Sequence, residues 1–447
     1  MTNIHDLAGI GIGPFNLSLA AQLDSITDLS VRFFDRVERF NWHPGMMLPG
    51  VELQTSFLKD LVTATNPTSP WSFVSYLVAH KRFYEFLNAG FEAVPRREFA
   101  RYLAWVAENL PTLRFGQAVR EVDFDGRHFS IALSDGERRL SRNLSVGVGL
   151  APHVPAWARP VLGDRAFHSC EATCRLGCLA GPRFAVVGGG QSGAEIVLHL
   201  ITAAPAGTQV TWISRRPGFQ PLDDSPFTDE QFTPPYVERF HALTEPRRRA
   251  TVERQKLAGD GISTSTLRAL YRRLYEIRHL GEGPRARLLP HREVLDLVQD
   301  GEESRLVMRN GFDGGIEMAN VDTIVLATGY SHKLPDFIAP LQDRLALGDD
   351  GLFRLDRDFS VKWEGPANRR IFALNAGRFS HGIAEPQLSL MAWRSAVIVN
   401  ALMGSQHFDL EELPPLVQWT GEDQPVVHVN RASGLQANSM LQSGGFT

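Results

Sequence analysis

Two glycine clusters in the chain have the spacing of loops that bind a pyrophosphate. The first, LAGIGIGPFN, supplies Gly9, Gly11 and Gly13, followed by Pro14 and Asn16. Glycines at such a turn let the backbone approach an anion at a helix N-terminus, where free N–H groups and the helix dipole favour negative charge. Pro14 suits the first helical position, which needs no N–H donor. A tight packing turn between a strand and a helix is the alternative explanation of this triplet.

An acidic residue follows the first cluster at the distance expected for a contact with ribose. A short apolar strand precedes the glycines, helical periodicity covers PFNLSLAAQL, and a second strand, LSVRFFDR, leads to Asp35. A strand, turn, helix and strand with an acid about twenty residues beyond the glycines is the dinucleotide-binding arrangement. We therefore expect Asp35 to accept a hydrogen bond from a ribose hydroxyl.

The second cluster, VVGGGQSGAE, has the complete G-x-G-x-x-G spacing. Gly188, Gly190 and Gly193 follow an apolar strand and open a helix. The next strand, QVTWIS, is followed by Arg215 and Arg216, where an acid would select the ribose 2′-hydroxyl and arginine accommodates a 2′-phosphate. This pattern favours NADPH over NADH at the second site. Two solvated surface arginines are the alternative.

Two nucleotide sites in one chain indicate hydride transfer between a nicotinamide and a flavin. A disulfide reductase of this kind would need a C-x-x-C pair, but Cys170, Cys174 and Cys178 are spaced C-x-x-x-C-x-x-x-C. A metal site formed by these thiols with His168 is less favoured than structural or incidental cysteines. Electrons from the reduced flavin are therefore expected to go to O2, as in a monooxygenase.

The bulk composition describes a globular enzyme. The chain has 447 residues, of which 43% are hydrophobic and 21% charged, and its formal net charge is -4. This balance does not indicate a nucleic-acid or anionic-membrane surface. No run of eighteen apolar residues predicts a membrane span, and the N-terminus lacks the basic flank of a signal peptide. The few cysteines fit a reducing compartment, so we expect a cytoplasmic protein.

The order of expected elements predicts an α/β fold with two Rossmann-like dinucleotide-binding domains, one for FAD and one for NADPH, and a smaller, mostly helical substrate-binding region. We expect the FAD domain to begin in residues 1–180 and the NADPH domain to occupy residues 181–320. The helical region is expected as an insertion at about residues 219–280, with a charged helical stretch from Glu245 to Arg278. The strand in VDTIVLATGY is expected to mark the return to the FAD domain, in residues 321–420, before a polar tail at residues 421–447.

Several longer motifs resemble the lysine/ornithine N-monooxygenase family, the microbial N-hydroxylating flavin monooxygenases. They are GIGPFNLSLA, WHPGM, QTSFLKDL, GVGLAPHVP, VVGGGQSGAE, DDSPFTDEQFTP, ATGY and HGIAEPQLSLMAWRSA, and the resemblance extends from about Leu7 to Trp419. FLKDL and the HGI…LSL stretch are more diagnostic than either glycine loop. The chain looks closest to the lysine- and diamine-hydroxylating branch that serves hydroxamate siderophores.

The resemblance implies a reaction in which NADPH reduces FAD and the reduced flavin captures O2 as a C4a-hydroperoxide. NADP+ stays bound and protects this intermediate, and a neutral primary amine attacks the distal oxygen to give a hydroxylamine. Because the amine must lose a proton to be nucleophilic, we expect activity to rise toward mildly alkaline pH. A homotetramer is usual in the family and is expected here.

The family's residue roles can be placed on matching positions of this chain. The expected FAD contacts are Gly9, Gly11, Gly13, Pro14, Asn16, Asp35, Trp42, His43, Gln54, Val122 (through its backbone, to the adenine), Pro386, Gln387 and Leu388. The expected NADPH contacts are Gly188, Gly190, Gln191, Ser192, Gly193, Ala194, Arg215 and Arg216. For Trp42 and His43, a plain turn is the alternative.

Three residues are expected at the amine substrate: Lys59, Asp229 and Ser389. In the family the lysine of FLKDL reaches the carboxylate of the amino acid, although Lys59 could also be a solvated lysine. Ornithine enzymes carry asparagines where this chain has Asp229 and, near DGIST, Ile262 or a neighbour. An acid at 229 suits an ammonium group, which fits a diamine such as cadaverine or putrescine and also the α-ammonium of lysine. We lean slightly to the diamine, while Asp229 facing solvent stays open.

Two other classes of protein remain as alternatives at this point. One is a related flavin monooxygenase that acts on sulfur or ketones, which should lack FLKDL and the SPF segment. The other is a non-catalytic nucleotide-binding protein, which would show no amine-dependent O2 uptake with NADPH.

Overall fold

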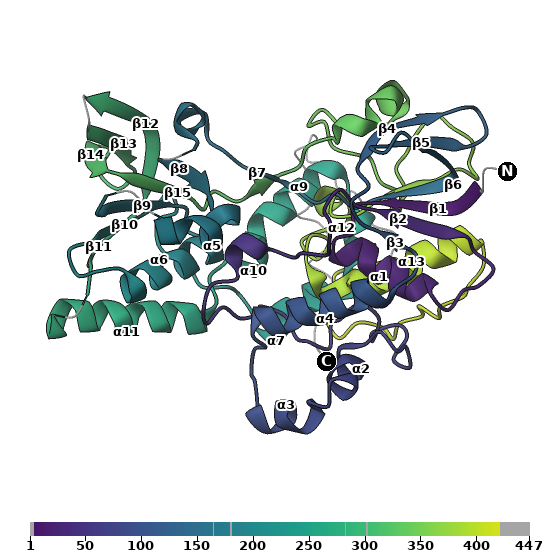
Figure 1. The fold of residues 1–447 in the computed structure, drawn as a ribbon, viewed down its shortest axis with the longest axis horizontal. Coiled ribbons are helices and arrows are strands. Elements are labelled where there is room, and N and C mark those ends of the chain that lie inside the picture. Colours follow the sequence, from purple (N-terminus) through teal and green to yellow (C-terminus); the bar gives the residue numbers. More distant parts are fainter. Residues whose placement is uncertain (1–3, 164, 179–180, 282, 301–302, 421–447) are drawn as a thin grey trace, which may run out of the picture.

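Two β-sheets, one mixed and one wholly parallel, lie side by side in the molecule, each with its own helical layer (Figure 1). The computed structural model describes residues 4–163, 165–178, 181–281, 283–300 and 303–420. The polar tail expected at residues 421–447 lies outside this part. None of the helices in the described ranges has the length and apolar content needed to cross a bilayer.

The first sheet contains the strand before the first glycine turn. Its order is β3 (Leu113–Arg114), β2 (Val31–Phe34), β1 (Ile4–Ile10), β6 (Arg138–Val146), β5 (Phe129–Leu133) and β4 (Val119–Phe124), with β17 (Ile371–Ala373) also on β6. The pairs among β3, β2, β1, β6 and β17 are parallel, and β4, β5 and β6 form an antiparallel meander. This arrangement confirms a strand, helix and strand unit at the first glycine cluster.

Side chains that alternate along the strands of the first sheet form one apolar layer on each face of the sheet. Leu7 and Phe33 face the cluster formed with helices α1 (Pro14–Leu23), α4 (Arg96–Asn109) and α13 (Met391–Met403). Ala8 and Phe34 face the opposite cluster, formed with the β4–β5 hairpin and the 3-10 helix at residues 336–344. A strand buried on both faces positions the turn at its end firmly.

The second sheet is wholly parallel. Its order is β11 (Arg285–Pro290), β10 (Gln209–Ser214), β9 (Arg183–Val187), β15 (Thr323–Leu326) and β8 (Ala166–His168). Helices α6 (Gln191–Ala203) and α11 (Thr264–Leu280) pack in one apolar cluster with this sheet. The antiparallel strands β12 (Arg292–Asp300), β13 (Glu303–Asn310) and β14 (Ile316–Val321) share a second cluster with it.

The strand pairing moves both expected domain boundaries. β8, expected in the first domain, pairs with β15, and β15 pairs with β9 inside the second sheet. The strand of VDTIVLATGY therefore completes the NADPH-type domain, and the chain returns to the first domain only after it. The two crossings are β7 (Ala151–Pro152) and β16 (Tyr330–Ser331), which pair antiparallel with each other. The boundaries at 181 and 321 were wrong because parallel partners are distant in sequence.

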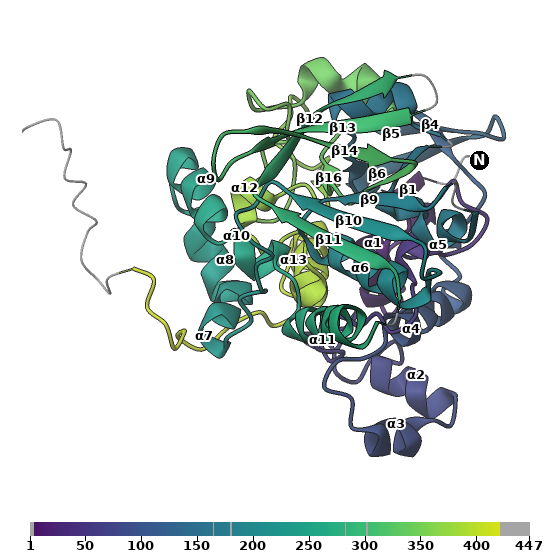
Figure 2. The same ribbon diagram turned by 90° about the vertical axis from the view of Figure 1, so that its left-hand side faces the viewer.

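The helical region is more divided than its charge pattern predicted. The expected stretch from Glu245 to Arg278 contains three helices, α9 (Glu245–Arg254), α10 (Lys256–Asp260) and α11, with Gly261 after α10. Before them come α7 (Pro226–Asp229) and α8 (Pro234–His241). Since α11 packs on the second sheet, only α7 to α10 form a separate helical layer, shown in Figure 2. Helices α2 (Phe73–Ala79) and α3 (Phe83–Ala89) project from the first domain.

Candidate functional site

The first glycine turn leaves a helix N-terminus open. Gly13 is the N-cap of α1, Pro14 occupies its first turn as expected, and no side chain caps the helix. Gly11 has φ +85°, and a Cβ there would lie 2.7 Å from Gly147 O, whereas the nearest atom to a Cβ at Gly13 is 3.9 Å away. The turn thus has free N–H donors beside open space, which fits a pyrophosphate.

Asp35 and Asn16 hold this turn in shape. Asp35 Oδ2 accepts the Ile12 N–H at 2.6 Å, which leaves further lone pairs for a ribose. Asn16 is fully buried, and its Nδ2 donates to Gly11 O at 2.7 Å while its Oδ1 accepts from Ser145 Oγ at 2.6 Å. The Asn16 side chain is therefore used inside the protein, and the expected contact with FAD stays a prediction for its backbone N–H alone.

Val122 lies in the edge strand β4. It has no exposed surface, pairs with Ile131 of β5 and packs in the apolar layer opposite α1. Its side chain therefore serves the core, and the expected backbone contact with the adenine stays a prediction. The role of a single position inside a strand depends on which face of the sheet is buried.

The second glycine turn is built around two close backbone approaches. Gly188 has φ +137°, and a Cβ there would lie 2.0 Å from Ala327 O, while a Cβ at Gly193 would lie 2.2 Å from Gly188 O. Gly190 is the N-cap of α6 with no capping side chain, so the helix N-terminus is free for an anion. Ser192 is half-buried in the first turn of α6.

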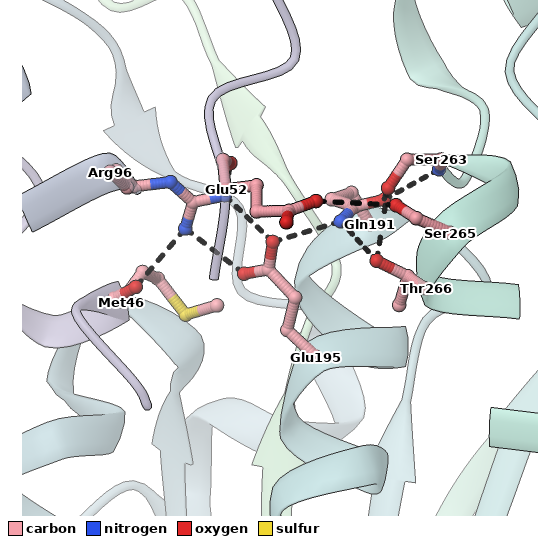
Figure 3. Close-up of polar contacts among 8 residues, drawn as sticks. All are labelled: Met46, Glu52, Arg96, Gln191, Glu195, Ser263, Ser265 and Thr266. Atoms are coloured by element: carbon pink, nitrogen blue, oxygen red, sulfur yellow. Dashed lines mark hydrogen bonds and ion pairs between the residues drawn. The ribbon is translucent and has the colours of Figure 1, made fainter. Parts of the chain in front are cut away.

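Two of the expected NADPH residues have internal roles. Ala194 is fully buried and its N–H donates to Gly190 O at 3.1 Å, so it does not reach a ligand and is corrected. The Gln191 side chain donates to Glu195 and Thr266 and accepts from the Ser263 N–H, as Figure 3 shows. Only the backbone of Gln191 is left for a pyrophosphate.

Arg215 and Arg216 differ although they are adjacent. Arg216 Nη1 donates to Asp260 O at 2.9 Å and to Gly189 O at 3.4 Å, so it ties α10 to the glycine turn. Arg215 is exposed just after β10, and its guanidinium has no partner within the described residues. Arg215 is therefore the better candidate for the 2′-phosphate.

We predict that Arg215→Ala reduces the preference for NADPH over NADH by at least about tenfold, because it removes a charge-assisted hydrogen bond to a phosphate. Arg216→Ala should instead lower the unfolding temperature and weaken both nucleotides together. Steady-state kcat/KM with each nucleotide, together with calorimetry, measures both effects. An unchanged preference in Arg215→Ala would identify Arg215 as a surface residue.

The WHPGM and QTSFLKDL motifs lie on one irregular segment between the two domains. The Trp42 ring packs edge-on against Phe99 of α4, with ring centroids 5.9 Å apart. His43 is in the left-handed region at φ 46° and is partly exposed to solvent. Desolvation by the protein around its ring and the charge of Arg96 lower its pKa, which favours the neutral imidazole. Gln54 is exposed beyond this turn.

The expected substrate residues are all free to receive a ligand. Lys59 is half-buried and Asp229 is exposed at the end of α7, and neither side chain has a partner within the described residues. Ser389 is 9% exposed, and its Oγ is a buried polar atom without a hydrogen bond in the described structure. Such an atom is costly unless a ligand or water completes it. Ile262, by contrast, is fully buried, so it does not replace a substrate-binding asparagine.

The segment HGIAEPQLS reaches both the first domain and the helical layer. Pro386, Gln387 and Leu388 are half-buried, and a Cβ at Gly259 of α10 would lie 3.3 Å from Gln387 Nε2. The motif thus continues from the first domain toward the helices that carry Asp229. Its half-buried residues and the buried Ser389 suit a shared flavin and substrate surface.

Sequence reasoning missed a buried ion pair behind this segment. Arg394 Nη1 lies 3.4 Å from Glu385 Oε1, and both side chains are almost fully buried. The guanidinium also lies 4.3 Å from the ring centroid of Phe15, directly after Pro14. The sequence LMAWRSAVIVNAL could have predicted this pair, because a single arginine in an apolar helix is buried and a buried charge needs a partner. The ion pair joins α13 to the HGIAEPQLS segment, and the contact with Phe15 joins α13 to α1.

A buried histidine makes the stability of this region depend on pH. His381 stacks on Phe359 at 4.0 Å, and burial, together with the charges of His241, Arg394 and Arg248, lowers its pKa to about 3. The unfolded chain therefore binds a proton that the folded protein does not between about pH 3 and 6.5, so stability is lost as pH falls through this window.

We predict that the unfolding temperature decreases steadily below about pH 6.5 and that His381→Gln makes this decrease shallower. His407→Gln, at an exposed position, serves as the control and should leave the slope unchanged. Differential scanning calorimetry at several pH values measures the slopes. Parallel curves for His381→Gln and the unaltered protein would contradict the assignment.

Comparison with known proteins identifies the two-nucleotide architecture. The sequence model described as L-lysine 6-monooxygenase/L-ornithine 5-monooxygenase matches residues 3–332. This chain belongs to that family. L-lysine N6-monooxygenase of Escherichia coli is 43% identical over 418 residues, which cover 93% of this chain and 98% of the relative.

Two solved structures of the family extend this similarity to the fold. The FAD-bound cadaverine monooxygenase of Erwinia amylovora has a TM-score of 0.88 at 30% identity, covering 95% of this chain and 100% of that one. The ornithine N-hydroxylase of Kutzneria, with reduced FAD, NADP+ and L-ornithine, has a TM-score of 0.83 at 29% identity, covering 90% and 99%. The family member described here is a flavin-dependent N-hydroxylating monooxygenase that uses FAD, NADPH and O2.

The two open helix N-termini fit these cofactors. α1 would hold the pyrophosphate of FAD, and α6 and Arg215 the phosphates of NADPH. When bound, the flavin supplies O2 activation, and the protein provides a site that orients the amine and excludes water.

Proposed function

We propose that this enzyme hydroxylates the side-chain amine of L-lysine for hydroxamate siderophore biosynthesis. The observation that carries the proposal is Lys59, a half-buried lysine whose ammonium group has no partner within the described residues. A half-buried ammonium without a counter-ion suits an anionic group of the substrate, and among the candidate amines only the amino acids carry a carboxylate. This proposal revises the slight preference for a diamine.

Asp229 complements this assignment. Its exposed carboxylate at the end of α7 also has no partner within the described residues, so it can accept the α-ammonium group. Lys59 and Asp229 together would match the two charges at the zwitterionic end of lysine. The 43% identity with the E. coli lysine enzyme supports the same substrate.

Cadaverine is the second candidate. Asp229 could receive its distal ammonium, and the cadaverine monooxygenase of Erwinia amylovora shares the fold closely, with a TM-score of 0.88. In this alternative Lys59 would have no anionic group to bind. The two candidates therefore differ in what Lys59 does, although both use Asp229.

A substrate panel tests the proposal. Hydroxylamine product, rather than NADPH consumption, should be measured with L-lysine, L-ornithine, cadaverine and putrescine, because uncoupled oxidation consumes NADPH without product. We expect the highest kcat/KM with L-lysine. A preference for cadaverine or putrescine would transfer the proposal to the diamines, and a preference for L-ornithine, which carries the same zwitterionic end, would contradict the assignment of L-lysine.

We also propose a homotetramer in the cytoplasm, which rests on the family resemblance. Size-exclusion chromatography with light scattering determines the number of subunits. A monomer at micromolar concentration would contradict this expectation.

A further inference from the structure

The segment that carries the flavin candidates packs partly into the other domain. Met46, Leu48 and Val51 belong to the apolar cluster of α6 and the second sheet, although their neighbours Trp42 and Phe57 pack against the core of the first domain. This stretch, residues 44–53, is called the bridging segment below. His43 and Gln54, two of the expected flavin contacts, flank this segment directly on its two sides.

Backbone contacts press the bridging segment against the second domain. A Cβ at Gly45 would lie 1.7 Å from Cys170 O, which leaves no room for any side chain. Thr173 Oγ1 donates to Pro44 O at 2.7 Å. Two contacts with the second domain therefore fix the chain next to His43: the close packing at Gly45 and the hydrogen bond to Pro44 O.

A bidentate ion pair joins the two domains beside this segment. Arg96, the first residue of α4, donates through Nη1 to Glu195 Oε2 at 3.0 Å and through Nη2 to Glu195 Oε1 at 2.6 Å (Figure 3). The same Nη1 donates to Met46 O at 3.0 Å. The side chains are only 12% and 4% exposed, so the pair is shielded from screening by salt. Paired donors and acceptors of this kind fix orientation as well as distance.

Gln191 connects this pair to the nucleotide-binding end of α6. Its Nε2 donates to Glu195 Oε1 at 2.9 Å and to Thr266 Oγ1 at 3.1 Å, and its Oε1 accepts the Ser263 N–H at 2.8 Å. Gln191 is the first residue of α6, directly after the N-cap Gly190. One side chain thus links the open helix N-terminus, the interdomain ion pair and the start of α11.

We propose that Arg96, Glu195 and Gln191 are positioning residues that hold the NADPH domain in a fixed position relative to the bridging segment. The network fixes α6 relative to His43 and Gln54, so the nicotinamide nucleotide and the flavin surface keep a productive separation. A displacement of about 1 Å at such a site can cost about a hundredfold in rate. When this relative position is lost, NADPH, a proton and O2 give NADP+ and hydrogen peroxide, and no hydroxylamine is formed.

The test compares Glu195→Gln, Arg96→Met and the double variant in the FAD-loaded enzyme. Each single variant should weaken NADP+ binding about tenfold, as measured by calorimetric titration, and should lower the hydroxylamine formed per NADPH at least about twofold, with a matching rise in hydrogen peroxide. The double variant should be no worse than the worse single variant, because both changes break one interaction. Glu195→Gln keeps the shape of the side chain and remains informative if Arg96→Met folds poorly.

A second ion pair on the same helix supplies the control. Arg82 and Glu98 are paired at 2.9 Å within the first domain, with Glu98 in the first turn of α4. Arg82→Met should lower the unfolding temperature without changing NADP+ affinity or the product ratio. If the Arg96 and Glu195 variants behave like this control, the network is only structural and the proposal is wrong. The product ratio is measured with whichever amine reacts best, so this result does not depend on the assignment of L-lysine.

Discussion

Replacing Lys59 by methionine is expected to lower kcat/KM for L-lysine by about a hundredfold, while kcat/KM for cadaverine changes less than about threefold. Removing one partner of a desolvated charge pair costs about 2–5 kcal/mol, of which the lower half suffices for this loss. Methionine keeps the apolar stem of lysine, so packing in the half-buried position is retained. Only for a substrate with a carboxylate should kcat/KM decrease strongly.

The measurement is the rate of hydroxylamine formation with each amine at saturating NADPH and O2. Lys333→Met provides a control, because Lys333 is well exposed and pairs locally with Asp336. Equal losses with L-lysine and cadaverine would show that Lys59 supports the site in another way. No loss with either amine would remove Lys59 from the substrate site.

Replacing Gly188 by alanine is expected to prevent the second domain from folding properly, whereas Gly190→Ala should leave the fold intact and weaken NADPH binding. At Gly188 the backbone has φ +137° and the new Cβ would lie 2.0 Å from Ala327 O, which belongs to the backbone and cannot rotate away. Strain of this kind should cost about 3 kcal/mol or more. At Gly190 φ is -106° and the nearest atom to a Cβ is Asp260 O at 3.8 Å, so alanine fits.

The two variants separate folding from binding. Thermal unfolding should show a large loss for Gly188→Ala and a change within about 2 °C for Gly190→Ala. The added methyl group at the N-cap of α6 stands where a phosphate would approach, so the KM for NADPH should rise about tenfold in Gly190→Ala. A normal KM in that variant would show that the pyrophosphate does not bind at this helix end.

Local pattern was sufficient to place both glycine turns, the helices that follow them and Pro14 at the start of α1. These features depend on neighbours within one turn of the chain, which the sequence displays directly. The domain limits near 181 and 321 failed because β8 and β15 find their partners in a sheet built mainly from other segments. No local signal distinguishes a strand of one parallel sheet from a strand of the next.

In the candidate site, too, local features could be predicted and long-range contacts could not. The motifs predict which segments carry Lys59, Gln191 and Ser389, but not the direction in which each side chain points. Gln191 and Asn16 turned inward because their amides complete buried hydrogen bonds, which depend on chain segments far away in sequence. The pair between Arg96 and Glu195 was not predicted for the same reason. The sequence shows each charged residue, but not which distant residue it pairs with in the fold.

The paired crossings β7 and β16 give the molecule the plan of a cassette inserted into a host. Both chain ends of the second domain leave the first domain side by side, with Tyr330 opposite Pro152. By connectivity alone, one nucleotide domain could be exchanged for another by two cuts in the gene. Met46, Leu48 and Val51 oppose such an exchange, because the host contributes them to the core of the cassette. A functional chimera would therefore need the bridging segment to be transferred together with the domain it supports.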